Sequence, residues 1–130
     1  MTAAHKLPFQ VDFGRHPAGL RVHVTGENTL ENTLAYWHAI VEQVRRRHPR
    51  GVMLVDEMHG PPLQAEDWKH LVEAIPHSVM GPVHVAHVRP GGGGLRALEY
   101  CEIFAREAGF DARVFSSEHE ADVWLRYGER

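Results

Sequence analysis

Residues 51–88 of the chain read GVMLVDEMHGPPLQAEDWKHLVEAIPHSVMGPVHVAHV, and this stretch decides the fold. Residues 52–55 form a continuous apolar run, which is typical of a strand buried on both faces. Apolar side chains then recur at helical spacing from Ala65 to Ile75, and Pro76 ends that pattern. Residues 83–88 form a second strand-like run. A strand, a helix and a strand in this order predict two neighbouring parallel strands joined by a helical crossover.

The same alternation extends in both directions along the chain. Residues 9–13 and 20–25 alternate apolar and polar side chains around a turn at 14–19, which predicts an antiparallel hairpin. A helical stripe follows over residues 30–44, with Asn28 as the expected N-cap. After residue 88 we expect a helix at 95–108, a short strand at 112–115 and a final helix capped by Ser117. The sequence therefore predicts an α/β fold: a mixed sheet of about five strands, an antiparallel hairpin followed by parallel strands, and about four helices.

The spacing also predicts the main loop and the core. A loop is expected at residues 56–63, which hold Gly60, Pro61 and Pro62. The side chains expected to be largely buried are Leu34, Trp37, Val41, Val52, Leu54, Val85, Val114 and Trp124.

Composition restricts the class of protein. The 130 residues suit one domain spanning 1–130, and the formal net charge of −3 argues against nucleic-acid binding. The single cysteine, Cys101, cannot form an internal disulfide, which fits a reducing compartment. No apolar run approaches 18 residues, and the N-terminal residues lack a secretory signal pattern. We therefore expect a cytoplasmic protein with no membrane span.

This succession of segments resembles the SpoIIAA-like family, part of the wider STAS group with the anti-sigma-factor-antagonist fold. The likeness is carried by the N-terminal hairpin, by GVMLVD at 51–56, by VHVAHV at 83–88 and by RVFSSEHEADVWL at 113–125. A strand ending in Val-Phe, a Ser-capped helix and a closing Ala-x-x-Trp-Leu stripe are similar to that family's C-terminus. The resemblance covers nearly the whole chain. It implies a single STAS-like domain with a role in protein association.

One departure from that family concerns its phosphorylation switch. STAS antagonists are switched at a Ser or Thr after the central strand. Here the corresponding stretch, DEMHGPPLQAED at 56–67, holds no hydroxyl side chain. The phospho-switch of those relatives therefore has no acceptor at this place, and the resemblance implies fold and association without that switch.

The candidate ligand site lies at the carboxyl ends of the predicted parallel strands, where ligands collect in α/β sheets. Four glycines before a helix can expose backbone N–H groups to an anion, with arginines on either side. The residues of this predicted ligand or anion site are Arg89, Gly91, Gly92, Gly93, Gly94, Arg96, Asp56 and His59. The alternative is a mobile connecting loop, since neither a Walker motif nor the full G-x-G-x-x-G spacing is present.

Acid–base and metal chemistry are weaker interpretations. In the predicted loop, His59 could fold back over Asp56, but the sequence supplies no nucleophile beside them, so we assign no catalytic residue. His84 and His87 are three apart on a strand and should face opposite sides of the sheet, and we predict neither a metal nor a cofactor. The basic run from Arg45 to Arg47 matches a helix C-terminus, where positive charge is favourable.

Three functions remain open at this level. The first is a non-enzymatic regulatory domain that binds another protein or its own copy. The second is a small-molecule or lipid-type binding domain, and the third is a small hydrolase-like enzyme using residues 56–59. Because we expect no helix over the outer face of the hairpin, we predict a weak homodimer through Arg21, His23 and Thr25.

Overall fold

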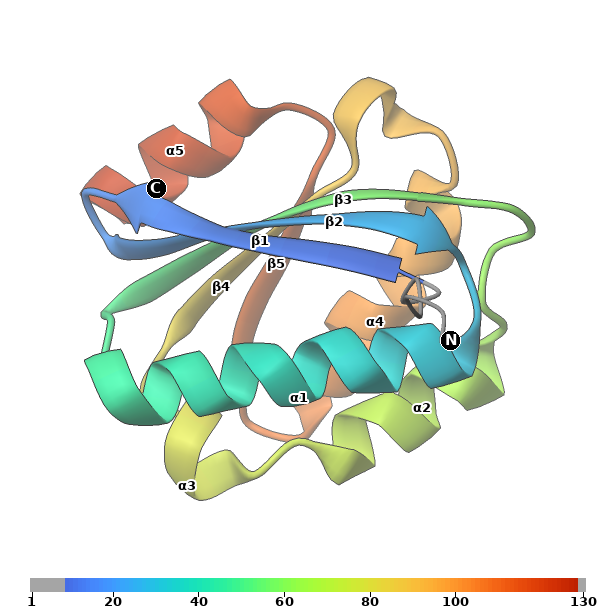
Figure 1. Cartoon of the computed structure of the whole chain (residues 1–130), viewed down its shortest axis with the longest axis horizontal. Coiled ribbons are helices and arrows are strands. Elements are labelled where there is room, and N and C mark those ends of the chain that lie inside the picture. Colours follow the sequence, from blue (N-terminus) through green and yellow to red (C-terminus); the bar gives the residue numbers. More distant parts are fainter. Residues whose placement is uncertain (1–8, 129–130) are drawn as a thin grey trace, which may run out of the picture.

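One mixed sheet of five strands organises the protein in the computed structural model, which describes residues 9–128 (Figure 1). The strands are β1 (Phe9–His16), β2 (Gly19–Glu27), β3 (Gly51–His59), β4 (His84–Val88) and β5 (Asp111–Phe115). They lie side by side in chain order. β1 pairs antiparallel with β2, and every later pair is parallel. The predicted fold class and the hairpin are confirmed.

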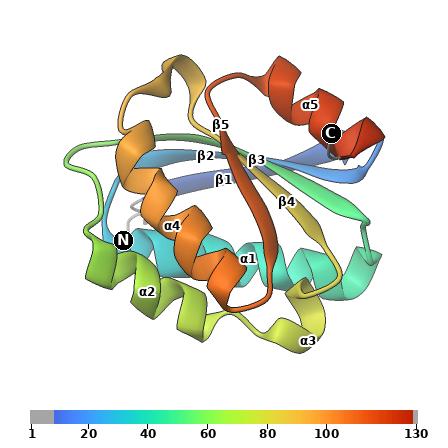
Figure 2. The same cartoon turned by 180° about the vertical axis from the view of Figure 1, so that it is seen from behind.

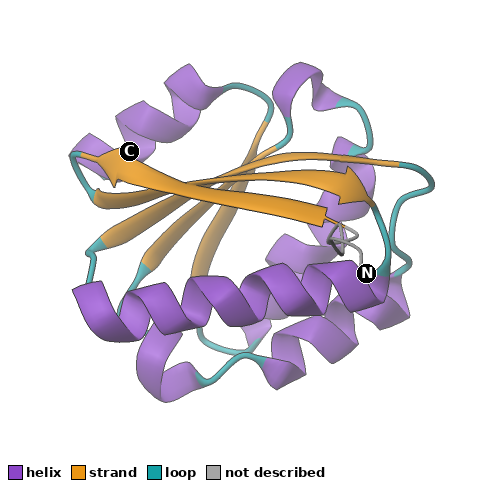
Figure 3. Ribbon diagram, in the orientation of Figure 1, coloured by secondary structure: helices purple, strands orange, loops and turns teal. Residues whose placement is uncertain are grey.

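Helices cover both faces of the sheet, but unequally. The helices are α1 (Leu30–Arg47), α2 (Ala65–Ala74), α3 (His77–Met80), α4 (Leu95–Glu107) and α5 (Glu118–Tyr127), with a 3-10 turn η1 (Pro90–Gly92) before α4. α1 to α4 lie on one face, and α5 lies alone on the other (Figures 1 and 2). Figure 3 shows the strands as the layer between these two groups. The four longer helices match the prediction, and α3 is an additional short one.

Two apolar cores follow from this arrangement. Successive side chains of β3 alternate between them: Val52 and Leu54 join the larger core beneath α1, whereas Met53 and Val55 join the smaller core beneath α5. This double burial explains why the sequence of β3 is continuously apolar. Trp124 is buried in the smaller core as predicted.

The predicted core residues are buried with two exceptions. Leu34 and Val114 are only half-buried. On α1 the buried stripe instead includes Tyr36 and Ile40, which are almost fully buried. The predicted stripe was therefore placed slightly off the true buried face of the helix, which contains Ile40 together with Trp37.

Two predicted boundaries near the strand ends were wrong. Residues 56–59 are not in a loop, because β2 continues to Glu27 and pairs with β3 as far as His59. The hydrogen-bonded ladder thus overrides the loop signals, and the loop begins at Gly60. The N-cap of α1 is Thr29, whose hydroxyl accepts a hydrogen bond from the Asn32 N–H.

Candidate functional site

A buried charged cluster lies where β3 and β4 end. Asp56, His87 and Arg89 form it, and we call it the strand-end cluster. Asp56 and His87 point to the same face of the sheet, and His87 Nε2 lies 2.8 Å from Asp56 Oδ2. The other carboxylate oxygen, Oδ1, accepts from Arg89 Nη1 at 3.1 Å and from the Met58 N–H at 3.0 Å. The carboxylate is therefore held by three donors: the Met58 N–H of β3, His87 of β4, and Arg89 directly after β4.

The electrostatics of the strand-end cluster favour an ionised Asp56. Burial alone raises the pKa of this carboxyl. The hydrogen bond and charge of His87, the Met58 N–H and the Arg89 charge outweigh burial, and the pKa of Asp56 lies below its ordinary value. Because an ionised carboxylate only accepts hydrogen bonds, His87 carries its proton on Nε2 in this pair.

Two other titratable groups near Asp56, Cys101 and Tyr36, stay neutral. Burial, with the nearby Asp56 charge, raises the pKa of the Cys101 thiol to about 12. Burial and the same carboxylate raise the pKa of Tyr36 well above its ordinary value. A thiol in this state is a poor nucleophile.

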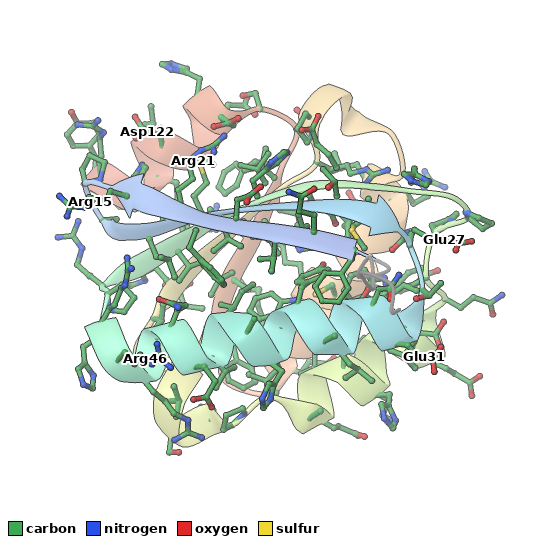
Figure 4. The ribbon with its side chains drawn as sticks, viewed as in Figure 1. Arg15, Arg21, Glu27, Glu31, Arg46 and Asp122 are labelled. Atoms are coloured by element: carbon green, nitrogen blue, oxygen red, sulfur yellow. The ribbon has the colours of Figure 1, made fainter. Side chains whose placement is uncertain are left out.

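A pocket of about 150 Å³ opens beside the strand-end cluster, and we call it the strand-end pocket. Its walls come from the ends of β2, β3 and β4, from α2 and from the start of α4. The lining residues are Asn28, Asp56, Gly60, Pro62, Leu63, Trp68, Arg89, Gly94, Ala97 and Leu98. In Figure 4, Glu27 and Glu31 mark the end of the molecule where β2 finishes and α1 begins, opposite Arg15 and Arg46.

The glycine run is partly engaged in its own hydrogen bonds. The Gly91 N–H donates to the Ser116 carbonyl and the Gly92 N–H donates to the Arg89 carbonyl. The Gly93 carbonyl accepts from Arg89 Nε at 2.8 Å, which fixes the arginine against the loop. Of the four glycines, only Gly94 lines the strand-end pocket, and it is also the N-cap of α4.

The structure brings together only part of the predicted ligand site. Asp56, Arg89 and Gly94 meet at the strand-end pocket. Arg96 is exposed and does not line it. The interpretation of His59 as a partner of Asp56 is wrong, because the two side chains are three positions apart on a continuous strand and face opposite sides of the sheet.

Sequence reasoning missed His87 and Trp68. His87 takes the place beside Asp56 that had been given to His59, and Trp68 packs edge-on against its ring at 6.1 Å. The sequence did hold a signal for this pair. His87 lies in the mostly apolar run at 83–88, and the neighbouring predicted strand is followed directly by Asp56. The prediction that His84 and His87 face opposite sides is confirmed: His84 is exposed and bonds to Asp111, whereas His87 is buried.

Two of the three predicted interface residues of the hairpin, Arg21 and His23, already have partners within the chain. Arg21 makes a two-oxygen contact with Glu118 of α5, with both Nη2–O distances at 2.9 Å. His23 Nε2 lies 2.6 Å from Glu57 Oε1, and Thr25 is half-buried. The expectation that no helix reaches this face was therefore wrong at Arg21, although α5 packs mainly on β3, β4 and β5. In Figure 4, Arg21 lies beside α5, the helix that carries its partner Glu118.

Comparisons with known proteins add no family assignment, since no family model matches the chain and no curated protein is significantly similar to it. Among residues 9–128, no helix combines the length and apolar character needed to cross a membrane. Within the same described residues, no group of three His, Cys, Asp or Glu side chains is placed to hold a metal ion.

Proposed function

We propose that this chain is a non-enzymatic regulatory domain that acts by binding. The observation that supports this proposal is the burial and hydrogen bonding of the Asp56 carboxylate. Its carboxylate is ionised, 4% exposed and occupied by three hydrogen bonds. A general base needs a free lone pair directed at a substrate proton, and this arrangement holds the carboxylate as a fixed structural anion instead.

The hydrolase alternative finds less support. His59 faces away from Asp56, and the Cys101 thiol is held protonated by burial. His87 bonds to Asp56, but in residues 9–128 no Ser, Thr or Cys side chain shares a hydrogen bond with it. A His–carboxylate pair with no nucleophile suits a folding and positioning role better than acyl transfer.

The STAS resemblance supports a role in protein association. The sheet has the strand content expected for that group, with an N-terminal hairpin and parallel strands after it. The stretch 56–67 has no hydroxyl side chain, so we propose regulation that does not use phosphorylation there. We further propose a cytoplasmic location, which the single buried Cys101 suits.

The proposed partner is a protein, with a second copy of this chain as the specific case. The outer face of the hairpin is polar, and Asp12 is exposed on it opposite His23. Because Arg21 and His23 already have partners within the chain, they have less capacity to bond to a second copy and the contact should be weak. A two-fold contact would place Asp12 of one copy near the basic side chains of the other.

Sedimentation velocity tests this association. At about 100 μM, on the order of a weak interface's dissociation constant, the chain should sediment as a monomer–dimer mixture that shifts with concentration. Asp12→Lys should abolish the shift, because it replaces the exposed carboxylate opposite His23 with a positive charge. Glu99→Lys, an equal charge change on the exposed side of α4, should leave it intact. A strict monomer at every concentration would contradict the homodimer.

The strand-end pocket favours a second candidate, a small-molecule binding domain. Its volume of about 150 Å³ is well below the several hundred Å³ common for drug-sized ligands. A lipid-type ligand therefore fits less well than a molecule of a few heavy atoms.

A further inference from the structure

Donor groups around the strand-end pocket lack acceptors. Arg89 uses Nε on Gly93 and Nη1 on Asp56, so its Nη2 has no hydrogen bond within residues 9–128. The indole N–H of Trp68 is also buried without a partner in the described part of the chain, and Trp68, 2% exposed, lines the pocket. The Arg89 side chain is 21% exposed, so Nη2 can reach an acceptor in the pocket, whereas the Trp68 indole nitrogen has almost no accessible surface.

The start of α4 adds a third source of donors. The helix begins after Gly94, and no side chain caps it. A Cβ built at Gly94 would meet nothing within 4 Å, so the backbone is open there. The Ala97 N–H already donates to the Gly94 carbonyl, so within the described residues the first-turn N–H groups left for a ligand are those of Leu95 and Arg96. The dipole of this 13-residue helix favours a negative charge at that place.

Charge and size restrict the ligand. The ionised Asp56 at the pocket wall repels a second negative charge, which disfavours dianions such as phosphate. Apolar walls from Leu63 and Leu98 suit a short hydrocarbon portion. The pocket volume of about 150 Å³ is below the roughly 300–1,000 Å³ common for drug-sized ligands, which favours a small molecule.

We propose that the strand-end pocket binds a small monocarboxylate. Its carboxylate accepts hydrogen bonds from Arg89 Nη2 and from the first N–H groups of α4, and its short apolar portion contacts Leu63 and Leu98. This site goes beyond the association proposed above and does not depend on it, because the hairpin face and the pocket use different residues.

Titration of ¹⁵N-labelled protein with sodium propionate tests the site. Saturable shifts are expected for the backbone amides of residues 94–97 and for the Trp68 indole N–H, with a dissociation constant on the order of 1 mM, as for ligands with few contacts. Propionamide has the same shape without the charge, and it should bind at least about tenfold more weakly. Inorganic phosphate should also bind more weakly than propionate.

Three variants locate the binding. Arg89→Gln removes the free donor and its charge, and Ala97→Leu fills the pocket while leaving the Arg89–Asp56 contact in place. Each should weaken propionate binding at least about tenfold. Arg106→Gln, at the far end of α4, should change it less than about twofold.

The proposal is overturned if propionate produces no saturable shift, if propionamide binds equally well, or if phosphate binds more tightly. Unchanged binding in Ala97→Leu would also overturn it. If Arg89→Gln fails to fold, the propionate affinity of Ala97→Leu tests the proposal by itself. None of these outcomes alters the sedimentation result, so the two proposals fail separately.

Discussion

At the scale of single residues, Asp56 is the side chain that holds the ends of β3 and β4 together. It is 4% exposed, yet it is charged, because His87, Arg89 and the Met58 N–H replace its hydration. A buried carboxylate of this kind is stable only while its partners remain, and the partners are equally dependent on it.

Removing the Asp56 charge should therefore destabilise the fold in a pH-dependent way. We expect Asp56→Asn to lower the free energy of unfolding by about 3 kcal/mol at pH 7, since it leaves Arg89 without its counter-charge. The folded-state pKa of Asp56 is below the unfolded value of about 3.9, so its contribution is present above about pH 4 and is lost as pH falls through the folded-state pKa.

Urea unfolding at several pH values measures this effect. The difference between wild type and Asp56→Asn should be largest near neutral pH and should shrink on acidification below about pH 4. Glu99→Gln, which changes an exposed carboxylate on α4, should show a small difference at every pH. A difference for Asp56→Asn that does not change with pH would show that the pKa of Asp56 is the same in the folded and unfolded chain, which would contradict the lowered folded-state pKa.

At the scale of elements, α5 is the helix with the least support. It is alone on its face of the sheet, over a core much smaller than the one beneath α1. Ser117 caps it by accepting from the Glu120 N–H, and Arg21 and His16 bind its side chains Glu118 and Asp122. The Arg21–Glu118 contact is half-exposed and contributes little, whereas the His16 side chain in the contact with Asp122 is 7% exposed. The apolar side chains through which α5 docks are Ala121, Trp124 and Leu125.

Trp124 is the main apolar anchor of α5. It is 8% exposed, contacts Phe115 at 5.7 Å between ring centroids and lies beneath the Arg113 guanidinium. We expect Trp124→Ala to cost roughly 3–5 kcal/mol, because the small core beneath α5 has few other large side chains to fill the space. His119→Ala, exposed on the same helix, should stay within about 0.5 kcal/mol. Thermal unfolding of both variants provides the comparison, and equal midpoints would contradict the anchoring role.

At the scale of the whole molecule, contacts between distant segments decide which glycines are essential. The turn of the β1–β2 hairpin packs on the α1–β3 connection, where the Gly51 N–H donates to the Ala18 carbonyl at 2.9 Å. Gly19 has φ +139°, and a Cβ there would lie 2.4 Å from Pro49 Cβ. Gly93, in the loop before α4, has φ −65° and open space around it.

A matched pair of substitutions tests this tertiary contact. Gly19→Ala should lower the free energy of unfolding by at least about 2 kcal/mol, because it combines backbone strain with a clash against Pro49. Gly93→Ala should be tolerated within about 0.5 kcal/mol. Chemical denaturation measures both, and a tolerated Gly19→Ala would show that the hairpin turn and the α1–β3 connection can separate without cost.

The order of elements could be predicted from the sequence because it depends on local periodicity. The continuous apolar run at 52–55 predicts a strand with two buried faces, and α5 opens at Ser117, the predicted cap. Each of these signals lies within a few neighbouring residues, so no long-range information is needed. The same local patterns identified Asp56 and Arg89 as residues at strand ends.

Only the tertiary structure decided which of these residues meet. The loop signals after Asp56 were overridden by pairing of β3 with β2, a contact between segments about thirty residues apart. That extension turned His59 away from Asp56, and the neighbouring strand supplied His87 instead. Side-chain direction on a strand reverses at every residue, so the length of pairing decides which face a polar group occupies. The sequence by itself determined the elements and their order, whereas register and packing between distant segments determined the strand-end cluster and its pocket.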